Sequence, residues 1–284
     1  MACEGWRAMR ADGRITHLVL ELTGRCQMRC RHCFADSSPR GGHGRMADAD
    51  WRRVLTSAAE SGVGRVQFIG GEPTLHPACA DLLEFALELG FGVEVFTNLV
   101  RVSARWWELF QRSGVSVATS YYSASATTHD MFTGLAGSHA RTRANIAEAV
   151  RRGVGIRVSV VDIGDAESAR ADLRTLGVHH IKTGRIRQIG RAAPAGRKPS
   201  MADLCGRCAQ GQAAIDPDGN VLPCVMARWI RIGNVCRTSL AEILASPRMA
   251  AVENEFHAAF DMAGGDGEGC SPDPQASCPP IGRP

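Results

Sequence analysis

The sequence contains no apolar run long enough to cross a membrane. Such a run needs about 18 to 20 residues, and none occurs in the 284 residues. Residues 1–14 also lack the apolar core of a signal peptide. We therefore expect a cytoplasmic protein with no membrane partner, in a reducing compartment that disfavours structural disulfides.

A strong excess of one charge is also absent. The chain has 33 Lys and Arg against 29 Asp and Glu, a formal net charge of +4, and its arginines are scattered. This balance argues against a nucleic-acid partner. At 284 residues, of which 44% are hydrophobic, the chain is long enough for one α/β barrel with a small appendage.

Cysteine, by contrast, is abundant and unevenly distributed. Of the 11 cysteines, Cys26, Cys30 and Cys33 fall within the single stretch ELTGRCQMRCRHCF. Six more occur at position 205 or later: Cys205, Cys208, Cys224, Cys236, Cys270 and Cys278. In a reducing compartment, such groups indicate metal ligands or catalytic thiols rather than disulfides.

Apolar runs of strand length alternate with longer helical patterns over most of the chain. Strands are expected within 17–22, 66–70, 93–98, 115–122, 156–163 and 178–190, and helices within 47–60, 77–89, 104–112, 138–152 and 165–176. A glycine follows each expected helix, where the chain must turn back into the next strand. This alternation predicts an α/β fold with a parallel sheet, helices outside it, and ligand chemistry at the carboxyl ends of the strands.

The alternation stops after Arg191 at the linker AAPAGRKPS. Beyond it, AAIDPDGNVLPC predicts two short strands around a turn, and SLAEILASPRMAAVENEF predicts one or two helices. The segment from Gly264 onward contains no predicted element, so a cluster bound by its cysteines would have to anchor it. We expect two domains, at 15–191 and 203–284.

The spacing of the first three cysteines suits an iron–sulfur cubane. Three thiolates can occupy three corners and leave one iron without a protein ligand, which is then open to a substrate or cofactor. A zinc site with a fourth ligand from His17, His32 or His43 is the alternative, although zinc motifs favour paired two-cysteine knuckles.

A second motif, FIGGEPTLHP, ends the expected second strand. Its adjacent glycines, Gly70 and Gly71, allow the backbone to approach a ligand closely, and Glu72 can accept hydrogen bonds from an ammonium group. Taken alone, the run Gly-Gly-Glu-Pro that ends at Pro73 would be an ordinary turn. Its place beside the cysteine loop favours a binding role.

The two motifs together resemble those of the radical S-adenosylmethionine (radical SAM) superfamily. CQMRCRHC matches the family's C-x-x-x-C-x-x-C signature, with His32 where an aromatic residue is usual, and GGEP matches its methionine-amine motif. The resemblance covers residues 15–191 and implies a partial (β/α)6 barrel with a 4Fe-4S cluster on Cys26, Cys30 and Cys33. It also implies that the open iron binds S-adenosylmethionine. Reductive cleavage, with an electron from flavodoxin or ferredoxin, would then yield a 5'-deoxyadenosyl radical that removes a substrate hydrogen.

Polar residues at the expected strand ends are further candidates by analogy with this family. Thr97, Asn98, Ser120, Arg187 and Arg191 are each expected to meet the ribose or the carboxylate of S-adenosylmethionine, although each could equally face solvent or cap a neighbouring element. The stretch YYSASATTHD is predicted to be a long loop that faces the substrate.

The later cysteines resemble the start of the family's SPASM or twitch extension, which carries auxiliary 4Fe-4S clusters. The C-x-x-C-x-x-x-x-x-C block of a full SPASM domain is missing. The resemblance therefore implies one auxiliary cluster. Its expected ligands are Cys205, Cys208, Cys224 and Cys270, with Cys278 as the substitute for Cys270. A four-cysteine zinc knuckle is the alternative.

Cys236 is left over by this assignment. It is either a buried bystander or, as in the twitch epimerases that act on aminoglycosides, a catalytic thiol that returns a hydrogen atom to a substrate radical. The second interpretation makes it the candidate catalytic residue.

Two substrate classes remain for an enzyme of this kind. The short segment before the first strand and the small extension favour a natural-product enzyme that oxidises or epimerises a secondary alcohol of a sugar or aminocyclitol. This small-molecule substrate is the main prediction. The sequence around SYYSASATTHDMFTG and the cysteine-bearing tail favour the alternative, a maturase that crosslinks or epimerises a ribosomal precursor peptide. An iron–sulfur scaffold without enzymatic turnover is disfavoured, because it would give the Gly-Gly-Glu-Pro loop no function.

Overall fold

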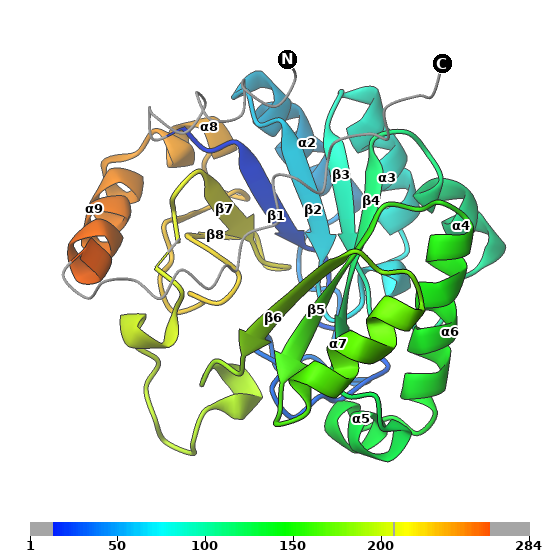
Figure 1. Cartoon of the computed structure of the whole chain (residues 1–284). Coiled ribbons are helices and arrows are strands. Elements are labelled where there is room, and N and C mark those ends of the chain that lie inside the picture. Colours follow the sequence, from blue (N-terminus) through cyan, green and yellow to red (C-terminus); the bar gives the residue numbers. More distant parts are fainter. Residues whose placement is uncertain (1–13, 207, 262–284) are drawn as a thin grey trace.

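The computed structural model describes residues 14–206 and 208–261, which form an open α/β sheet structure (Figure 1). The strands are β1 (His17–Glu21), β2 (Arg65–Ile69), β3 (Gly92–Phe96), β4 (Val115–Tyr121), β5 (Ile156–Asp162), β6 (His180–Arg185), β7 (Gln212–Ile215), β8 (Asn220–Leu222) and β9 (Gly233–Asn234). They make one nine-stranded sheet in the order β6-β5-β4-β3-β2-β1-β7-β8-β9. Strands β1 to β6 are parallel, as the alternating pattern predicted.

Helices follow most of these strands along the chain. They are α2 (Asp48–Glu60), α3 (Cys79–Glu88), α4 (Ala104–Phe110), α5 (Ala126–Thr133), α6 (Ser138–Arg151), α7 (Ala166–Thr175), α8 (Leu240–Leu244) and α9 (Pro247–Asp261), with short 3-10 turns at η1 (Pro73–Leu75), η2 (Gly190–Ala192) and η3 (Met201–Asp203). No helix of the described residues is both long and apolar enough to span a membrane.

The main core lies between the sheet and its helices. Leu18 and Leu20 of β1 are fully buried in the same cluster as Trp51 and Leu55 of α2. The opposite face of β1 carries Val19, which packs with apolar residues of β2, β7 and β8 in a smaller cluster. Because both faces of β1 are covered, all five of its residues are buried, as is usual for a central parallel strand. The sheet ends at β6 and β9 without closing, which confirms the predicted partial barrel.

The segment after the linker joins the barrel's own sheet. Strand β7 pairs in parallel with β1, with Leu18 opposite Ala213, and β8 returns antiparallel beside β7. The two strands expected around a turn are confirmed, and the segment expected to form one or two helices forms two, α8 and α9. Cys208 lies just before β7, the strand that is hydrogen-bonded to the barrel, and Cys224 lies just after β8.

The prediction of a long loop after the fourth strand is wrong for the second half of that segment. Tyr121 ends β4, and α5 begins only a few residues later. The Ser125 hydroxyl accepts a hydrogen bond from the Thr128 N–H and so caps α5, while His129 and Thr133 bury one face of the helix. A serine N-cap was the available signal in the sequence.

Candidate functional site

The cysteine loop after β1 lines a cavity at the carboxyl ends of the strands. Cys26, Cys30 and Cys33 all contribute to its wall, together with Gly70 and Gly71 from the loop after β2. No other cysteine of the described residues lines this cavity. The donor set therefore fits a cubane with three protein ligands and one open iron, as the spacing predicted.

Hydrogen-bond donors are directed at these sulfurs. The Met28 backbone N–H donates to Cys26 Sγ at 3.4 Å, and the Tyr122 hydroxyl donates to the Cys30 sulfur. Burial raises the pKa of Cys26 to about 12 and that of Cys30 to about 11. Both groups are thiols at neutral pH without iron, so cluster binding must release their protons, and the donors then stabilise the thiolates.

The two adjacent glycines bring the loop after β2 into contact with the cysteine loop. Gly71 N donates to Thr23 O at 2.6 Å, and Glu72 N donates to Arg25 O at 2.9 Å. A Cβ on Gly70 would stand 2.6 Å from Thr23 O, and one on Gly71 would stand 2.4 Å from Arg25 O. The sequence predicted only that these glycines let the backbone approach a ligand. It did not reveal that they also let the two loops pack against each other.

The Glu72 carboxylate is 1% exposed and hydrogen-bonded within the protein. Its Oε1 accepts from the Thr74 hydroxyl at 2.7 Å and the Thr97 hydroxyl at 2.8 Å, and its Oε2 accepts from Asn98 N at 2.8 Å. Burial raises its pKa, and these hydrogen bonds oppose that effect. Glu72 and Pro73 stand outside the residues that line the cavity. The Glu72 side chain thus connects the loop after β2 to the end of β3. Its contact with an ammonium group stays a prediction.

All five predicted polar candidates line the site. Four line the cysteine cavity, Thr97, Asn98, Ser120 and Arg191, and Arg187 lines a larger cavity beside it. Asn98 Nδ2 donates to Cys26 Sγ at 3.7 Å, and Asn98 Oδ1 accepts from Gln27 Nε2 at 3.0 Å. Ser120 lines the cysteine cavity and also the larger cavity beside it. Arg187 lines the larger cavity, where its Nη1 donates to a backbone carbonyl at 2.9 Å.

Arg191 binds the cysteine loop through its side chain and its backbone. Its Nε donates to Cys30 O at 2.9 Å, its Nη1 to Asp36 Oδ1 at 2.6 Å and its Nη2 to Ser37 O at 2.6 Å. Its backbone N–H donates to Cys33 O at 3.0 Å. Arg191 thus holds two of the predicted cluster ligands, Cys30 and Cys33, through their carbonyls. It also lines the cysteine cavity, and its contact with the cofactor stays a prediction.

Replacing Arg191 with alanine is therefore expected to lower S-adenosylmethionine cleavage by about 10- to 100-fold, the usual cost of losing a residue that orients metal ligands. Arg191→Lys keeps the positive charge but cannot donate from three planar guanidinium nitrogens at once. We therefore expect a smaller loss of S-adenosylmethionine cleavage than in Arg191→Ala. Iron content, the reduction potential of the cluster and the rate of 5'-deoxyadenosine formation are the measurements. Arg105→Ala is the matched control, because Arg105 bonds Asp81 and Glu84 on an exposed surface. Equal effects of Arg191→Ala and Arg105→Ala would contradict the assignment.

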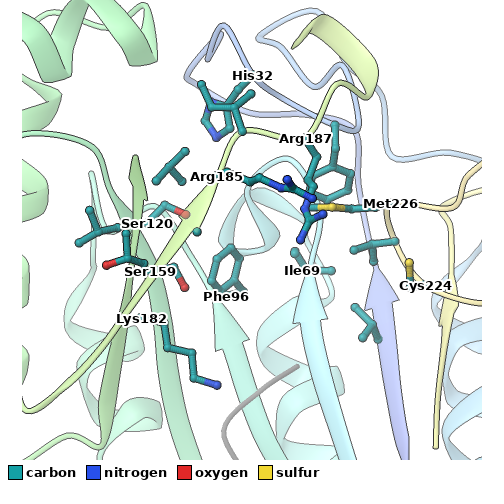
Figure 2. Close-up of a pocket in the computed structure, with 18 of the residues that line it drawn as sticks. His32, Ile69, Phe96, Ser120, Ser159, Lys182, Arg185, Arg187, Cys224 and Met226 are labelled. Atoms are coloured by element: carbon teal, nitrogen blue, oxygen red, sulfur yellow. The ribbon is translucent and has the colours of Figure 1, made fainter. Parts of the chain in front are cut away.

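A larger cavity of about 230 Å³ adjoins the cysteine cavity. The residues that line both cavities are His32, Phe34, Ile69, Phe96 and Ser120. Figure 2 shows Phe96 and Ile69 in its middle, Ser120 and Lys182 on one side, and Cys224 on the other. A molecule bound here lies next to the cluster site.

The three histidines considered as zinc ligands are dispersed. Burial lowers the pKa of His32 to about 4, and its ring lies between Phe132 and Tyr122 at centroid distances of 4.8 and 5.1 Å. His17 is buried within β1, and His43 Nδ1 shares a hydrogen bond of 2.9 Å with a threonine hydroxyl. Among the described residues, no three His, Cys, Asp or Glu side chains converge as around one metal ion. The irons of a cubane stand at separate corners, so its three ligands do not need such convergence.

A second group of cysteines lies in the extension. Cys205, Cys208 and Cys224 are buried, and the Sγ atoms of Cys208 and Cys224 are 2.9 Å apart. Cys224 also lines the larger cavity. The two further candidates, Cys270 and Cys278, lie outside the described residues.

Cys236 lines neither of the two cavities. Its side chain is exposed, so the interpretation as a buried bystander is wrong. Its Sγ lies 3.5 Å from Met46 Sδ, and it is absent from the residues that line the two cavities. The role of Cys236 as a hydrogen donor stays an untested prediction.

Sequence comparisons relate the chain to proteins of peptide biosynthesis. It is 33% identical over 125 residues to PqqA peptide cyclase of Rhodopseudomonas palustris, a match that covers 44% of this chain and 33% of that protein. It is 24% identical over 268 residues to the antilisterial bacteriocin subtilosin biosynthesis protein AlbA of Bacillus subtilis, covering 81% of this chain and 60% of that protein. The chain thus matches less than two thirds of either relative.

Solved structures share the fold at low identity. Streptococcus suis SuiB bound to precursor peptide SuiA matches with a TM-score of 0.70 and 15% identity, covering 89% of this chain and 70% of that one. BtrN in complex with AdoMet and 2-DOIA matches with a TM-score of 0.54 and 16% identity, covering 85% of this chain and 87% of that one.

Family models agree with the geometry of the site. The radical SAM superfamily model matches residues 20–174, and the SPASM iron–sulfur cluster-binding domain matches residues 195–271. The first match spans more than half of the chain and contains both the cysteine loop and the Gly-Gly-Glu-Pro loop. The protein is therefore a member of the radical SAM superfamily, an enzyme that binds 4Fe-4S clusters and S-adenosylmethionine and carries a SPASM extension.

Proposed function

We propose that this enzyme crosslinks or epimerises a ribosomally made precursor peptide. The observation that carries the proposal is the sequence likeness to PqqA peptide cyclase and to the subtilosin biosynthesis protein AlbA. The main prediction from the sequence, chemistry on a sugar or aminocyclitol, has weaker support. The likeness to BtrN with 2-DOIA has a TM-score of 0.54, against 0.70 for SuiB with its precursor peptide.

In this proposal, residues of the chain bind and orient the cofactor and the peptide, and they exclude water from the reacting atoms. The bound cluster and S-adenosylmethionine supply a 5'-deoxyadenosyl radical that abstracts hydrogen. Cys26, Cys30 and Cys33 would hold the cluster, and the strand-end residues Asn98 and Ser120 would contact S-adenosylmethionine. The cofactor also meets the Gly-Gly-Glu-Pro loop. The aromatic and aliphatic side chains shared by the two cavities keep water away from the reacting atoms.

We further propose a barrel at 15–191 and an extension at 203–284. The extension holds one auxiliary 4Fe-4S cluster on Cys205, Cys208, Cys224 and one later cysteine. The burial of these three thiols supports this assignment. Flavodoxin or ferredoxin is the proposed electron donor.

The test is an anaerobic reaction with a short precursor peptide encoded beside the gene. The reconstituted enzyme, S-adenosylmethionine and dithionite should convert the peptide into a product that has lost hydrogen atoms, if it is crosslinked. Epimerisation should instead incorporate solvent deuterium in deuterated buffer. Mass spectrometry distinguishes the two results, and omission of S-adenosylmethionine is the control. An unchanged peptide, together with oxidation of an aminocyclitol by the same preparation, would refute the proposal.

A further inference from the structure

We propose that the Ser37 hydroxyl donates a hydrogen bond to the bound 4Fe-4S cluster, next to Cys33, and thereby raises the reduction potential of that cluster. Ser37 was not among the candidates that the sequence indicated. Hydrogen bonds to the sulfurs of an iron–sulfur cluster are one of the features that set its potential. Ser37 would therefore control how readily the cluster accepts the electron that cleaves S-adenosylmethionine.

A tight turn brings Ser37 back against Cys33. The Asp36 backbone N–H donates to Cys33 O at 3.3 Å, and Asp36 adopts the left-handed conformation, with φ at 53°. Aspartate tolerates this conformation better than most residues other than glycine. The Ser37 backbone N–H then donates to Cys33 Sγ at 3.3 Å. Ser37 is thus bonded directly to one of the three cysteines that would hold the cluster.

Arg191 fixes Ser37 in this place. Its Nη2 donates to Ser37 O at 2.6 Å, and its Nη1 donates to Asp36 Oδ1 at 2.6 Å. Both backbone polar groups of Ser37 are therefore occupied, the N–H by the Cys33 sulfur and the C=O by Arg191. The hydroxyl is the polar group of Ser37 that is left for a further contact.

This hydroxyl is buried without a partner. Ser37 is 4% exposed and lines the cavity that also contains Cys26, Cys30 and Cys33. Within the part of the chain that the structure describes, no atom forms a hydrogen bond with Ser37 Oγ. Burying a hydroxyl without a hydrogen bond is unfavourable. We therefore expect its partner to belong to the group that fills this cavity.

The position of Ser37 favours the cluster over S-adenosylmethionine as that partner. Its Oγ is only three bonds away from the nitrogen that donates to Cys33 Sγ, so the hydroxyl lies near the iron that Cys33 would hold. S-adenosylmethionine would bind instead at the iron without a cysteine. A serine hydroxyl rotates to suit an acceptor, and the inorganic sulfides of a cluster are acceptors. Because the reduced cluster carries more negative charge, a donor stabilises it more than the oxidised cluster.

The decisive measurement is the reduction potential of this cluster in Ser37→Ala. Alanine removes the hydroxyl and adds no atom, so the backbone contacts with Cys33 and Arg191 remain. We expect the equilibrium constant for one-electron reduction to fall about three- to tenfold, a shift of about 28 to 59 mV to lower potential. The reconstituted full-length enzyme is titrated without S-adenosylmethionine and followed by electron paramagnetic resonance. The signal of this cluster is the one that is missing in Cys30→Ala.

The neighbouring serine supplies a matched control. Ser38 is the next residue of the same loop and does not line the cavity, so Ser38→Ala should leave the potential unchanged. Ser37→Thr keeps a hydroxyl and should keep the potential, whereas Ser37→Val has nearly the same shape without the hydroxyl and should lower it. This second pair also decides the matter if Ser37→Ala retains too little iron to titrate.

An unchanged potential in Ser37→Ala, or equal shifts in Ser37→Ala and Ser38→Ala, would overturn the proposal. A shift that occurs only after S-adenosylmethionine is added would overturn it as well, because the hydroxyl would then contact the cofactor rather than the cluster. The titration needs neither peptide nor turnover. Its result is therefore independent of the substrate class proposed above.

Discussion

Replacing Cys30 with alanine is expected to abolish S-adenosylmethionine cleavage. Cys26, Cys30 and Cys33 are the cysteines of the described chain that line the first cavity, so the variant leaves two thiols for a cubane that needs three. Within residues 14–206 and 208–261, no other cysteine lines this cavity to substitute. The reconstituted variant should lose the iron and sulfide of this cluster and form 5'-deoxyadenosine only at the background rate under dithionite.

The matched control is Cys236→Ala, which removes an exposed thiol beside Met46 and outside both cavities. It should keep its iron and its rate of S-adenosylmethionine cleavage. An unchanged peptide product would also refute the predicted role of Cys236 as a hydrogen donor. Normal 5'-deoxyadenosine formation by Cys30→Ala would contradict the assigned ligands. Zinc in place of iron and sulfide in the unaltered protein would contradict the cluster itself.

Gly71→Ala should be nearly as damaging, although it changes no ligand. The new Cβ would stand 2.4 Å from Arg25 O and 3.0 Å from the Cys26 Cβ, so the backbone of the cysteine loop must move. Overpacking of this kind costs about 1–3 kcal/mol of folding free energy. The displaced Cys26 should also lower cluster content, and we expect S-adenosylmethionine cleavage to fall with it. Thermal unfolding and iron analysis measure the two effects separately.

Gly64→Ala is the control for this change. Gly64 lies just before β2, and a Cβ there meets nothing within 4 Å. This variant should keep both its stability and its clusters. If Gly71→Ala kept a full complement of iron, the contact between the two loops would not be what positions Cys26.

Much of the barrel could be predicted because its signals are local. Each strand is a short apolar run, and each turn after a helix contains a glycine. The spacing of apolar residues and the positions of the turns can therefore be seen within a few residues of sequence. The cysteine spacing is equally local, which is why three candidate cluster ligands and the Gly-Gly-Glu-Pro loop could be named from the sequence. Helix α5 was missed because its apolar face is short. The N-cap residue Ser125 was the available sequence signal for its start.

The contacts that complete the site are not local. Arg191 donates to the carbonyl of Cys30 across 161 positions of sequence, and β7 pairs with β1 although nearly the whole barrel lies between them. Patterns of apolar residues reveal that a strand exists but not which strand it pairs with. The lining of the larger cavity likewise brings together Val19, Gln67 and Arg185, from strands far apart in the sequence.

The amino-acid sequence by itself determined the chemistry of this protein, because three closely spaced thiols and an adjacent glycine pair are defined by neighbours along the chain. Only the tertiary structure decided which residues hold those thiols in place, where Cys236 lies, and which residues line the larger cavity. These outcomes depend on distances between segments far apart in sequence, and such distances are set by the packing and pairing of the whole sheet.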